Sequence, residues 1–187
     1  IFEHLINAEQ IIDKYIYNND KNYLEIKEID LDGDGLNEII VNTPLVNFYL
    51  SPHRGGCVFE LDFKPCLFNL LDTLKRRKEF YHKKIQQQQT QFKYDNEGTK
   101  SIHEIFNSKE AGLEKYLNYD WYEHKYLLDH FLEEDSTLEN FRQGVYKERG
   151  NFVTEPYVCD IKNTQNFLMV LFKKDGDVLC KGQNSGE

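Results

Sequence analysis

The fold of this 187-residue chain is decided between residues 24 and 63, which read LEIKEIDLDGDGLNEIIVNTPLVNFYLSPHRGGCVFELDF. The first run in this segment alternates apolar with charged residues, and three further apolar runs follow at 39–41, 45–50 and 57–63. Short apolar runs bounded by clusters of Gly, Pro, Asn and Asp are typical of β-strands. The segment therefore predicts consecutive strands joined by turns.

The run 57–63 shows the clearest alternation of apolar and acidic residues. Successive side chains of a strand point to opposite faces of the sheet. We therefore expect Val58, Glu60 and Asp62 on one face. The opposite face then carries Cys57, Phe59, Leu61 and Phe63.

A helix is predicted before the strands. Apolar residues recur there at helical spacing on the stripe Ile1, Leu5, Ala8, Ile12 and Tyr15. This spacing predicts an amphipathic helix whose stripe needs a partner surface. We assign residues 1–20 to this N-terminal helix and residues 21–187 to a β-domain that we expect to be truncated at its C-terminal end.

The C-terminal half contains short helices in loops, predicted at 109–117 and after the capping residue Ser136, before strand patterns return. The run 167–172 is predicted to pair with 178–180 across the turn 174–177. Many short strands and few helices give a mainly β fold and favour a β-sandwich over alternating α/β units.

Charge and cysteine usage exclude several classes of function. The chain has 32 acidic and 23 basic residues and a net charge of −9, which argues against a nucleic-acid partner. We interpret the basic run 75–78, near Tyr81 and His82, as a solvated or acid-paired segment. No segment approaches the ~18 apolar residues of a membrane span. The four cysteines lack a C-x-x-C pair, which predicts buried thiols in a reducing cytoplasm.

The sharpest local signal is an acidic loop, Asp30-Leu31-Asp32-Gly33-Asp34-Gly35-Leu36-Asn37-Glu38. Acidic residues at positions one, three, five and nine, around a glycine at six, are the spacing of a calcium loop. The predicted ligands of this Ca²⁺ site are the carboxylates of Asp30, Asp32, Asp34 and Glu38 and the carbonyl oxygen of Leu36. Val41 stands where an EF-hand has its bidentate glutamate. The alternative is a solvated Asp/Gly turn between strands.

Two further segments are candidates for ligand binding. His53 and Arg54 precede two glycines between strands, where they line a polar ligand groove or form an ordinary polar turn. The aromatic segments 119–122 and 127–131 carry acids and histidines, a composition that suits either a sugar site or core packing. In the core interpretation, Asp129 and His130 are the expected exceptions, because burying them unpaired is expensive.

Catalytic motifs are missing from the sequence. It has no G-x-S-x-G, no phosphate-cradling glycine loop and no H-E-x-x-H, so nucleophilic and metalloprotease chemistry have no recognisable basis. None of the acids stands out as a catalytic pair of the kind that glycoside cleavage needs.

Taken in order, these motifs resemble the C-terminal region of glycoside hydrolase family 57 enzymes of the 4-alpha-glucanotransferase and alpha-amylase type. The likeness runs from the first helix to about Tyr157 and rests on the ordered set rather than on any one motif. The set is Asp30-x-Asp32-Gly33-Asp34-Gly35-x-Asn37-Glu38, Ser51-Pro52-x-Arg54-Gly55-Gly56, Glu60-Leu61-Asp62, Asn69-x-x-Asp72-Thr73-Leu74-x-Arg76-Arg77-x-Glu79-x-Tyr81-His82, Ser101-Ile102-His103, Tyr119-Asp120 and Leu128-Asp129-His130-Phe131.

The resemblance implies a sandwich of the galactose mutarotase-like (supersandwich) type packed behind or beside a (β/α)₇ barrel of the same polypeptide. The helix at 1–20 is then expected to pack on that barrel or to lead from it. That barrel carries the catalytic carboxylates, so no catalytic residue transfers to this chain. The implied function is an accessory domain of an enzyme acting on alpha-1,4-glucan, with His53, Arg54, Tyr81 and His82 as candidate substrate contacts. A stand-alone carbohydrate-binding module is the alternative. Aldose epimerisation through His82 or His103 rests on fold analogy alone.

Overall fold

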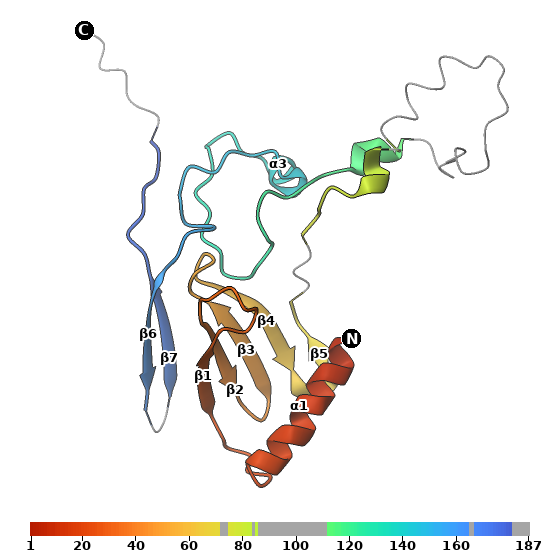
Figure 1. Ribbon diagram of the computed structural model, residues 1–187. Coiled ribbons are helices and arrows are strands. Elements are labelled where there is room, and N and C mark those ends of the chain that lie inside the picture. The colour runs from red at the N-terminus through yellow and green to blue at the C-terminus, as the bar shows by residue number, and fades with distance from the viewer. Residues whose placement is uncertain (72–74, 84, 86–111, 165–166, 181–187) are drawn as a thin grey trace, which may run out of the picture.

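The computed structural model describes residues 1–71, 75–83, 85, 112–164 and 167–180 (Figure 1). A five-stranded antiparallel sheet in the order β1-β2-β3-β4-β5 forms its centre, and a separate hairpin pairs β6 with β7. The predicted mainly β fold class is therefore confirmed; the sandwich type stays a prediction. The elements are α1 (Phe2–Ile16), β1 (Glu25–Ile29), β2 (Glu38–Asn42), β3 (Val46–Ser51), β4 (Cys57–Phe63), η1 (Lys64–Cys66), β5 (Phe68–Asn69), η2 (Leu113–Tyr116), α3 (Leu138–Gln143), β6 (Val158–Asn163) and β7 (Leu168–Lys173).

One face of the five-stranded sheet carries the apolar core. Its buried centre consists of Ile39, Val41, Leu50 and Val58, and residues of the β6–β7 hairpin pack against it. The hairpin thus closes this face as a second layer. The partly buried contributors are Ile26, Phe48, Leu61, Leu71, Cys159, Ile161, Leu168, Val170 and Phe172.

Helix α1 lies over the other face and contacts η1 and β5 (Figure 1). Only Ile6 and Asp13 of this helix are buried, and most of its contacts with the sheet are polar. The predicted stripe does not face the sheet, because all five of its members are exposed. The periodicity located the helix correctly, and the partner surface that the stripe needs is not found among the described residues.

A β-bulge interrupts β4. Tyr49 pairs with Glu60 and the next residue, Leu50, pairs with Val58, so Phe59 is the extra residue on β4. Val58 and Leu61 consequently both reach the apolar core. The strict alternation predicted for 57–63 is therefore wrong, because the extra residue shifts the facing of the side chains on either side of it.

The C-terminal strands pair differently from the prediction. β7 pairs with β6 along its whole length, and Val178 instead bridges Gly150, so the predicted hairpin across 174–177 is wrong. The two predicted short helices are shorter than expected or begin one residue later. Of the predicted helix 109–117, residues 109–111 lie outside the described residues, and η2 covers part of the remainder. Helix α3 is capped by the hydroxyl of Thr137 rather than by Ser136.

The cysteine prediction is correct in part. All four cysteines are free thiols, but only Cys57 is buried, whereas Cys66 and Cys180 are exposed. In the described part of the chain, no helix combines the length and apolar character needed to cross a membrane.

Candidate functional site

The acidic loop connects β1 to β2 and is organised around the Asp30 carboxylate. This group accepts hydrogen bonds from the backbone N–H of Gly33, Asp34 and Gly35, at 2.8, 3.0 and 2.9 Å. Both glycines have φ in the left-handed region, at 76° and 88°, a conformation that glycine adopts without steric penalty. The sequence pattern therefore specifies a turn that wraps its backbone around one carboxylate.

Three of the predicted metal ligands come together in this loop. Carboxylate oxygens of Asp30, Asp32 and Glu38 lie within 4.8 Å of one another. Glu38 is buried and accepts a hydrogen bond from the backbone N–H of Leu31 at 3.1 Å. Three convergent carboxylates form an oxygen-rich donor set that suits a hard cation such as Ca²⁺. Asp34 lies outside the group, and the Leu36 carbonyl stays a predicted ligand.

Arg54 brings a second segment to the loop. Its Nη2 atom lies 2.5 Å from both Asp32 Oδ2 and Asp34 Oδ2. This guanidinium holds the pKa of the Asp34 carboxyl below its usual range, helped by the backbone N–H of Leu36. A cation entering the loop would therefore compete with Arg54 for Asp32.

The turn that carries Arg54 is fixed by close backbone packing. Gly55 has φ 86°, and a Cβ there would lie 2.2 Å from the carbonyl oxygen of Val153. Its N–H donates to the Glu155 carbonyl at 3.1 Å. A side chain at this position is sterically excluded, so the Gly55-Gly56 pair allows residues 153–157 to pack against the turn and to set the position of Arg54.

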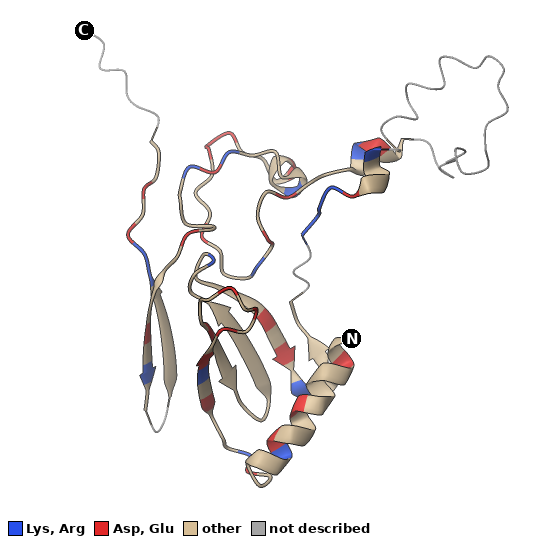
Figure 2. Cartoon of the chain, in the orientation of Figure 1, with Lys and Arg blue, Asp and Glu red and all other residues tan. Residues whose placement is uncertain are grey.

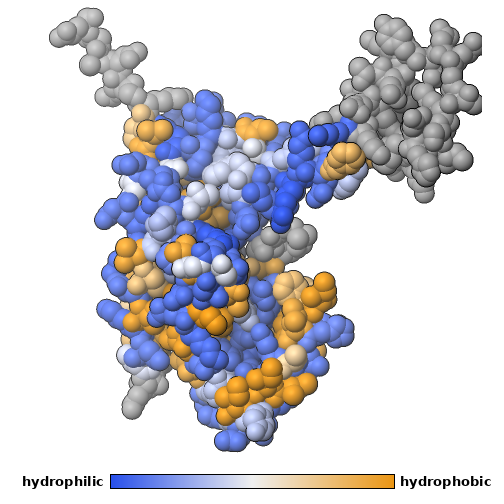
Figure 3. Space-filling model, viewed as in Figure 1, coloured by the Kyte–Doolittle hydropathy of each residue, from blue (hydrophilic) through white to orange (hydrophobic). Residues whose placement is uncertain are grey.

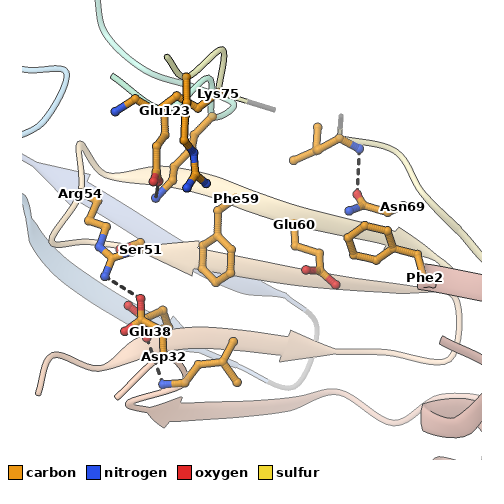
Figure 4. Close-up of a pocket in the computed structure, with 14 residues that line it drawn as sticks. Phe2, Asp32, Glu38, Ser51, Arg54, Phe59, Glu60, Asn69, Lys75 and Glu123 are labelled. Atoms are coloured by element: carbon orange, nitrogen blue, oxygen red, sulfur yellow. Dashed lines mark hydrogen bonds and ion pairs between the residues drawn. The ribbon is translucent and has the colours of Figure 1, made fainter. Parts of the chain in front are cut away.

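Beside Arg54, a cavity of about 380 Å³ opens on the α1 side of β4; we call it the β4 pocket. Figure 4 shows Phe59 between Ser51 and Glu60, with Lys75 and Glu123 on the opposite wall. The pocket also touches the acidic loop through Asp32 and Glu38. Its complete lining is Phe2, Leu31, Asp32, Glu38, Ser51, Arg54, Phe59, Glu60, Asn69, Leu71, Lys75, Arg77, Glu123 and Lys125.

The other predicted contact residues lie elsewhere. His53 lines a separate cavity together with Leu36 of the acidic loop and Tyr157. Tyr81 and His82 belong to a short helical turn, where the rings stack edge to face at 4.5 Å and Tyr119 Oη lies 3.2 Å from His82 Nδ1. Neither Tyr81 nor His82 lines the β4 pocket, so of these four residues the pocket contains Arg54 alone.

The aromatic segments 119–122 and 127–131 are only partly buried, and their polar side chains have partners from other segments. Burial would raise the pKa of Asp120, but hydrogen bonds from the Arg76 side chain and backbone hold it well below its usual range. His130 Nδ1 lies 2.8 Å from Glu148 Oε2, and Tyr157 donates to Asp129 at 2.9 Å. The half-buried His130 is therefore paired, as the cost of burying it alone requires, whereas Asp129 is exposed.

Several lining residues of the β4 pocket were missed from the sequence. Phe59 and Glu60 point into it together only because of the bulge, and Lys75, Arg77 and Glu123 approach from distant segments. A bulge leaves no reliable mark in a single sequence. The only available signal was the motif spacing from Ser51 to Asn69, which does not fix the facing of any side chain.

Comparison with protein families gives one match over most of the chain. The family model described as "Alpha-amylase/4-alpha-glucanotransferase, C-terminal" matches residues 30–185. This range contains the acidic loop, the Arg54 turn and every other lining segment of the β4 pocket except Phe2. The result confirms the family expected from the ordered motifs.

Individual relatives agree with the family match. Alpha-amylase 1 of Dictyoglomus thermophilum is 38% identical over 97% of this chain, and the 4-alpha-glucanotransferase of Thermococcus litoralis is 34% identical over 84% of it. The crystal structure of the Thermococcus litoralis 4-alpha-glucanotransferase superposes with a TM-score of 0.72 at 29% identity, covering 97% of this chain. The chain spans about a quarter of the length of these relatives, 25%, 22% and 24% in turn.

Proposed function

Because this chain belongs to the alpha-amylase/4-alpha-glucanotransferase C-terminal family, we propose that it is the accessory β-domain of an enzyme acting on alpha-1,4-glucan. In this proposal the domain docks on a (β/α)₇ catalytic barrel of the same polypeptide and stabilises it. Bond cleavage belongs to that barrel, in the three quarters of the relatives' length that this chain does not span.

The observation that carries the proposal is the exposed apolar stripe of α1. Leu5 and Ile12 are 55% and 54% exposed, whereas Ile6 on the sheet-facing side is 1% exposed. Apolar side chains gather over α1 on the molecular surface (Figure 3). A contiguous apolar surface of this kind marks an interaction site rather than a solvated face. The exposed apolar residues of the helix are Ile1, Phe2, Leu5, Ile11, Ile12, Tyr15 and Ile16.

The occupant of this surface is proposed to be the catalytic part of the same polypeptide. An isolated helix face rich in leucine and isoleucine needs an apolar counterpart of matching length, and a large covalently linked domain supplies it at high effective concentration. The relatives contain such additional chain. Burying each of these side chains contributes roughly 1.5–3 kcal/mol.

The experiment uses the complete polypeptide that contains this chain. We expect the double variant Leu5→Ser, Ile12→Ser to split one cooperative thermal transition into two and to shorten the half-life of glucan-cleaving activity at elevated temperature. Asn7→Asp is the matched control, because Asn7 is exposed on α1 outside the stripe. Unchanged melting of the double variant would refute docking through α1. A gene encoding this chain without a barrel would favour the stand-alone carbohydrate-binding module.

We also propose that the acidic loop binds Ca²⁺ through Asp30, Asp32 and Glu38, with Asp34 and Leu36 completing the ligand set. Close carboxylates repel one another, and a divalent cation reverses that repulsion. The convergence of three carboxylates supports this proposal. Calorimetric titration of Ca²⁺ into chelator-treated protein should release or absorb heat and raise the melting temperature. If neither effect appears, the loop is an ordinary Asp/Gly turn.

A further inference from the structure

We propose that the β4 pocket binds a neutral saccharide and holds one or two glucose units of an alpha-glucan chain. The inference rests on the proposed function, because it specifies where this domain meets the glucan. It assigns new contact residues: Phe59, Glu60, Asn69, Lys75 and Arg77.

The bulge in β4 sets which side chains enter the pocket. Tyr49 pairs with Glu60 and Leu50 pairs with Val58, so Phe59 is the extra residue of the bulge. The consequence is that an aromatic ring and a carboxyl group enter the pocket side by side (Figure 4). On a regular strand, adjacent residues would point to opposite faces. Bulges that re-aim a side chain are concentrated next to functional sites.

The lining of the pocket carries charges of both signs. Four acidic and four basic side chains line it, and because Glu60 holds its proton at neutral pH, three acidic and four basic groups are ionised. Two of each sign compensate one another at close range: Arg54 contacts Asp32, and Lys125 Nζ lies 3.1 Å from Glu123 Oε2. A site for a phosphate or a cation would show one predominant sign. Interspersed donors and acceptors instead suit a ligand with many hydroxyl groups and no net charge.

Polar groups in the pocket have unused hydrogen-bonding capacity. Among the described residues, neither the half-buried Lys75 nor the exposed Arg77 makes a hydrogen bond or a close ion pair, although the hydrogen bond from Lys125 and the charge of Lys75 lower the pKa of Glu123. The buried Ser51 hydroxyl likewise has no partner among the described residues. Burial, together with the nearby Asp62 carboxyl, raises the pKa of Glu60, so at neutral pH this group keeps its proton, donates it to Asp62 and can accept through its other oxygen. Of these groups only the Ser51 hydroxyl is buried, and an unsatisfied buried group calls for an explanation such as a ligand.

The size of the pocket fits a short saccharide. A volume of about 380 Å³ lies near the lower end of small-molecule sites and admits a short saccharide rather than a folded partner. Lys125 Nζ lies over one face of the Phe59 ring, 5.7 Å from its centroid, so the C–H side of a sugar ring would stack on the other face. Phe2 of α1 lines the far end, so a bound glucan chain would lie beside the proposed docking surface.

The test is titration of the 187-residue chain with maltotriose, followed by amide chemical shifts and calorimetry. We expect binding with a Kd of about 1 mM or tighter and shifts centred on residues 59–60 and 69. Arg77→Gln and Phe59→Leu should each weaken binding at least about tenfold. Arg142→Gln is the matched control, because Arg142 is an exposed arginine on α3 that pairs with Glu139.

Three results would overturn the proposal. They are no binding at about 10 mM maltotriose, binding that both pocket variants leave unchanged, and preferential binding of inorganic phosphate at the same residues, which would make the pocket an anion site. Thermal unfolding of each variant checks that the fold is retained. None of these results affects docking through α1, which is tested with different residues in the complete polypeptide.

Discussion

The two faces of the five-stranded sheet are covered by opposite chemistry. The face toward the β6–β7 hairpin is apolar and contains Ile39, Val41 and Leu50. The face toward α1 is held by hydrogen bonds from polar side chains, and acidic positions mark both α1 and β4 on that side (Figure 2). Apolar contacts are non-directional, whereas hydrogen bonds have defined geometry. The polar face can therefore fix the rotation of α1 and keep its apolar stripe outward.

Lys64 is the centre of the polar face. Its side chain is 1% exposed. The ammonium group donates to Asp13 Oδ2 at 2.7 Å, to Asn42 Oδ1 at 2.6 Å and to the Thr43 carbonyl at 2.7 Å, and it contacts Tyr23 Oη at 3.0 Å. Burial would raise the pKa of Asp13, but hydrogen bonds from Lys64, Asn42 and Tyr23 together with the Lys64 charge outweigh it, and the pKa is lowered. This buried charge is thus fully paired.

Replacing Lys64 should cause the largest loss in the free energy of unfolding. Lys64→Met leaves the Asp13 carboxylate buried without its cation, and breaking a buried ion pair from one side destabilises a protein by about 3–5 kcal/mol. Ile39→Val on the apolar face is the matched comparison, with an expected loss of about 0.5–1.5 kcal/mol. Urea unfolding monitored by circular dichroism measures both. Equal losses at the two positions would mean that the two faces respond to substitution in the same way.

The same contrast explains what could be predicted from sequence. The strands of the meander and the position of α1 follow from local periodicity and turn residues. The stripe Ile1 to Tyr15 was recognised, but periodicity cannot tell whether its partner lies in the same chain. Periodicity also did not identify the face with Glu9 and Asp13 as the one that contacts the sheet. In a helical pattern, a polar face that packs against a sheet cannot be distinguished from a polar face exposed to solvent.

The candidate site divides in a similar way. Asp30, Asp32 and Glu38 are close in sequence, so their spacing was enough to predict that they converge. The β4 pocket depends on a bulge at Phe59 and on the approach of two distant pairs of residues, Lys75 with Arg77 and Glu123 with Lys125. Tertiary packing brings these residues to the pocket. A single sequence contains no motif that would predict which distant segments pack together.

The free energy of unfolding should fall as pH rises, because acids on the polar face hold protons more tightly in the folded state. Burial, with the charge of Asp62, raises the pKa of Glu60 to about 8 from an ordinary 4.5, and Glu9 of α1 contributes to the shift. The folded state therefore holds the proton more tightly than the unfolded state. This stabilisation is complete below about pH 4.5 and is lost as pH rises through about 8.

We expect the free energy of unfolding to fall by about 1–2 kcal/mol over that range, allowing for screening by solvent. Lys64, the nearby cation on this face, acts on Asp62 in the opposite direction and limits the effect. Melting temperatures measured across the range should decline in the parent and decline less in Glu60→Gln, where the raised pKa of Asp62, about 6, still contributes. A parent protein that is more stable at alkaline pH would contradict the assignment.

The smallest change in the free energy of unfolding is expected at Arg54, which lies in the turn between β3 and β4. Its contacts with Asp32 and Asp34 are exposed to solvent, and exposed ion pairs contribute about 0–1 kcal/mol. Arg54→Gln should therefore leave chelator-treated protein nearly unchanged in urea unfolding. The same variant should bind Ca²⁺ several-fold more tightly, because the cation no longer competes with a guanidinium for Asp32. Calorimetry of parent and variant measures the difference, and Arg142→Gln controls for the loss of one positive charge. Weaker Ca²⁺ binding by Arg54→Gln would show that Arg54 organises the loop for the cation instead of competing with it.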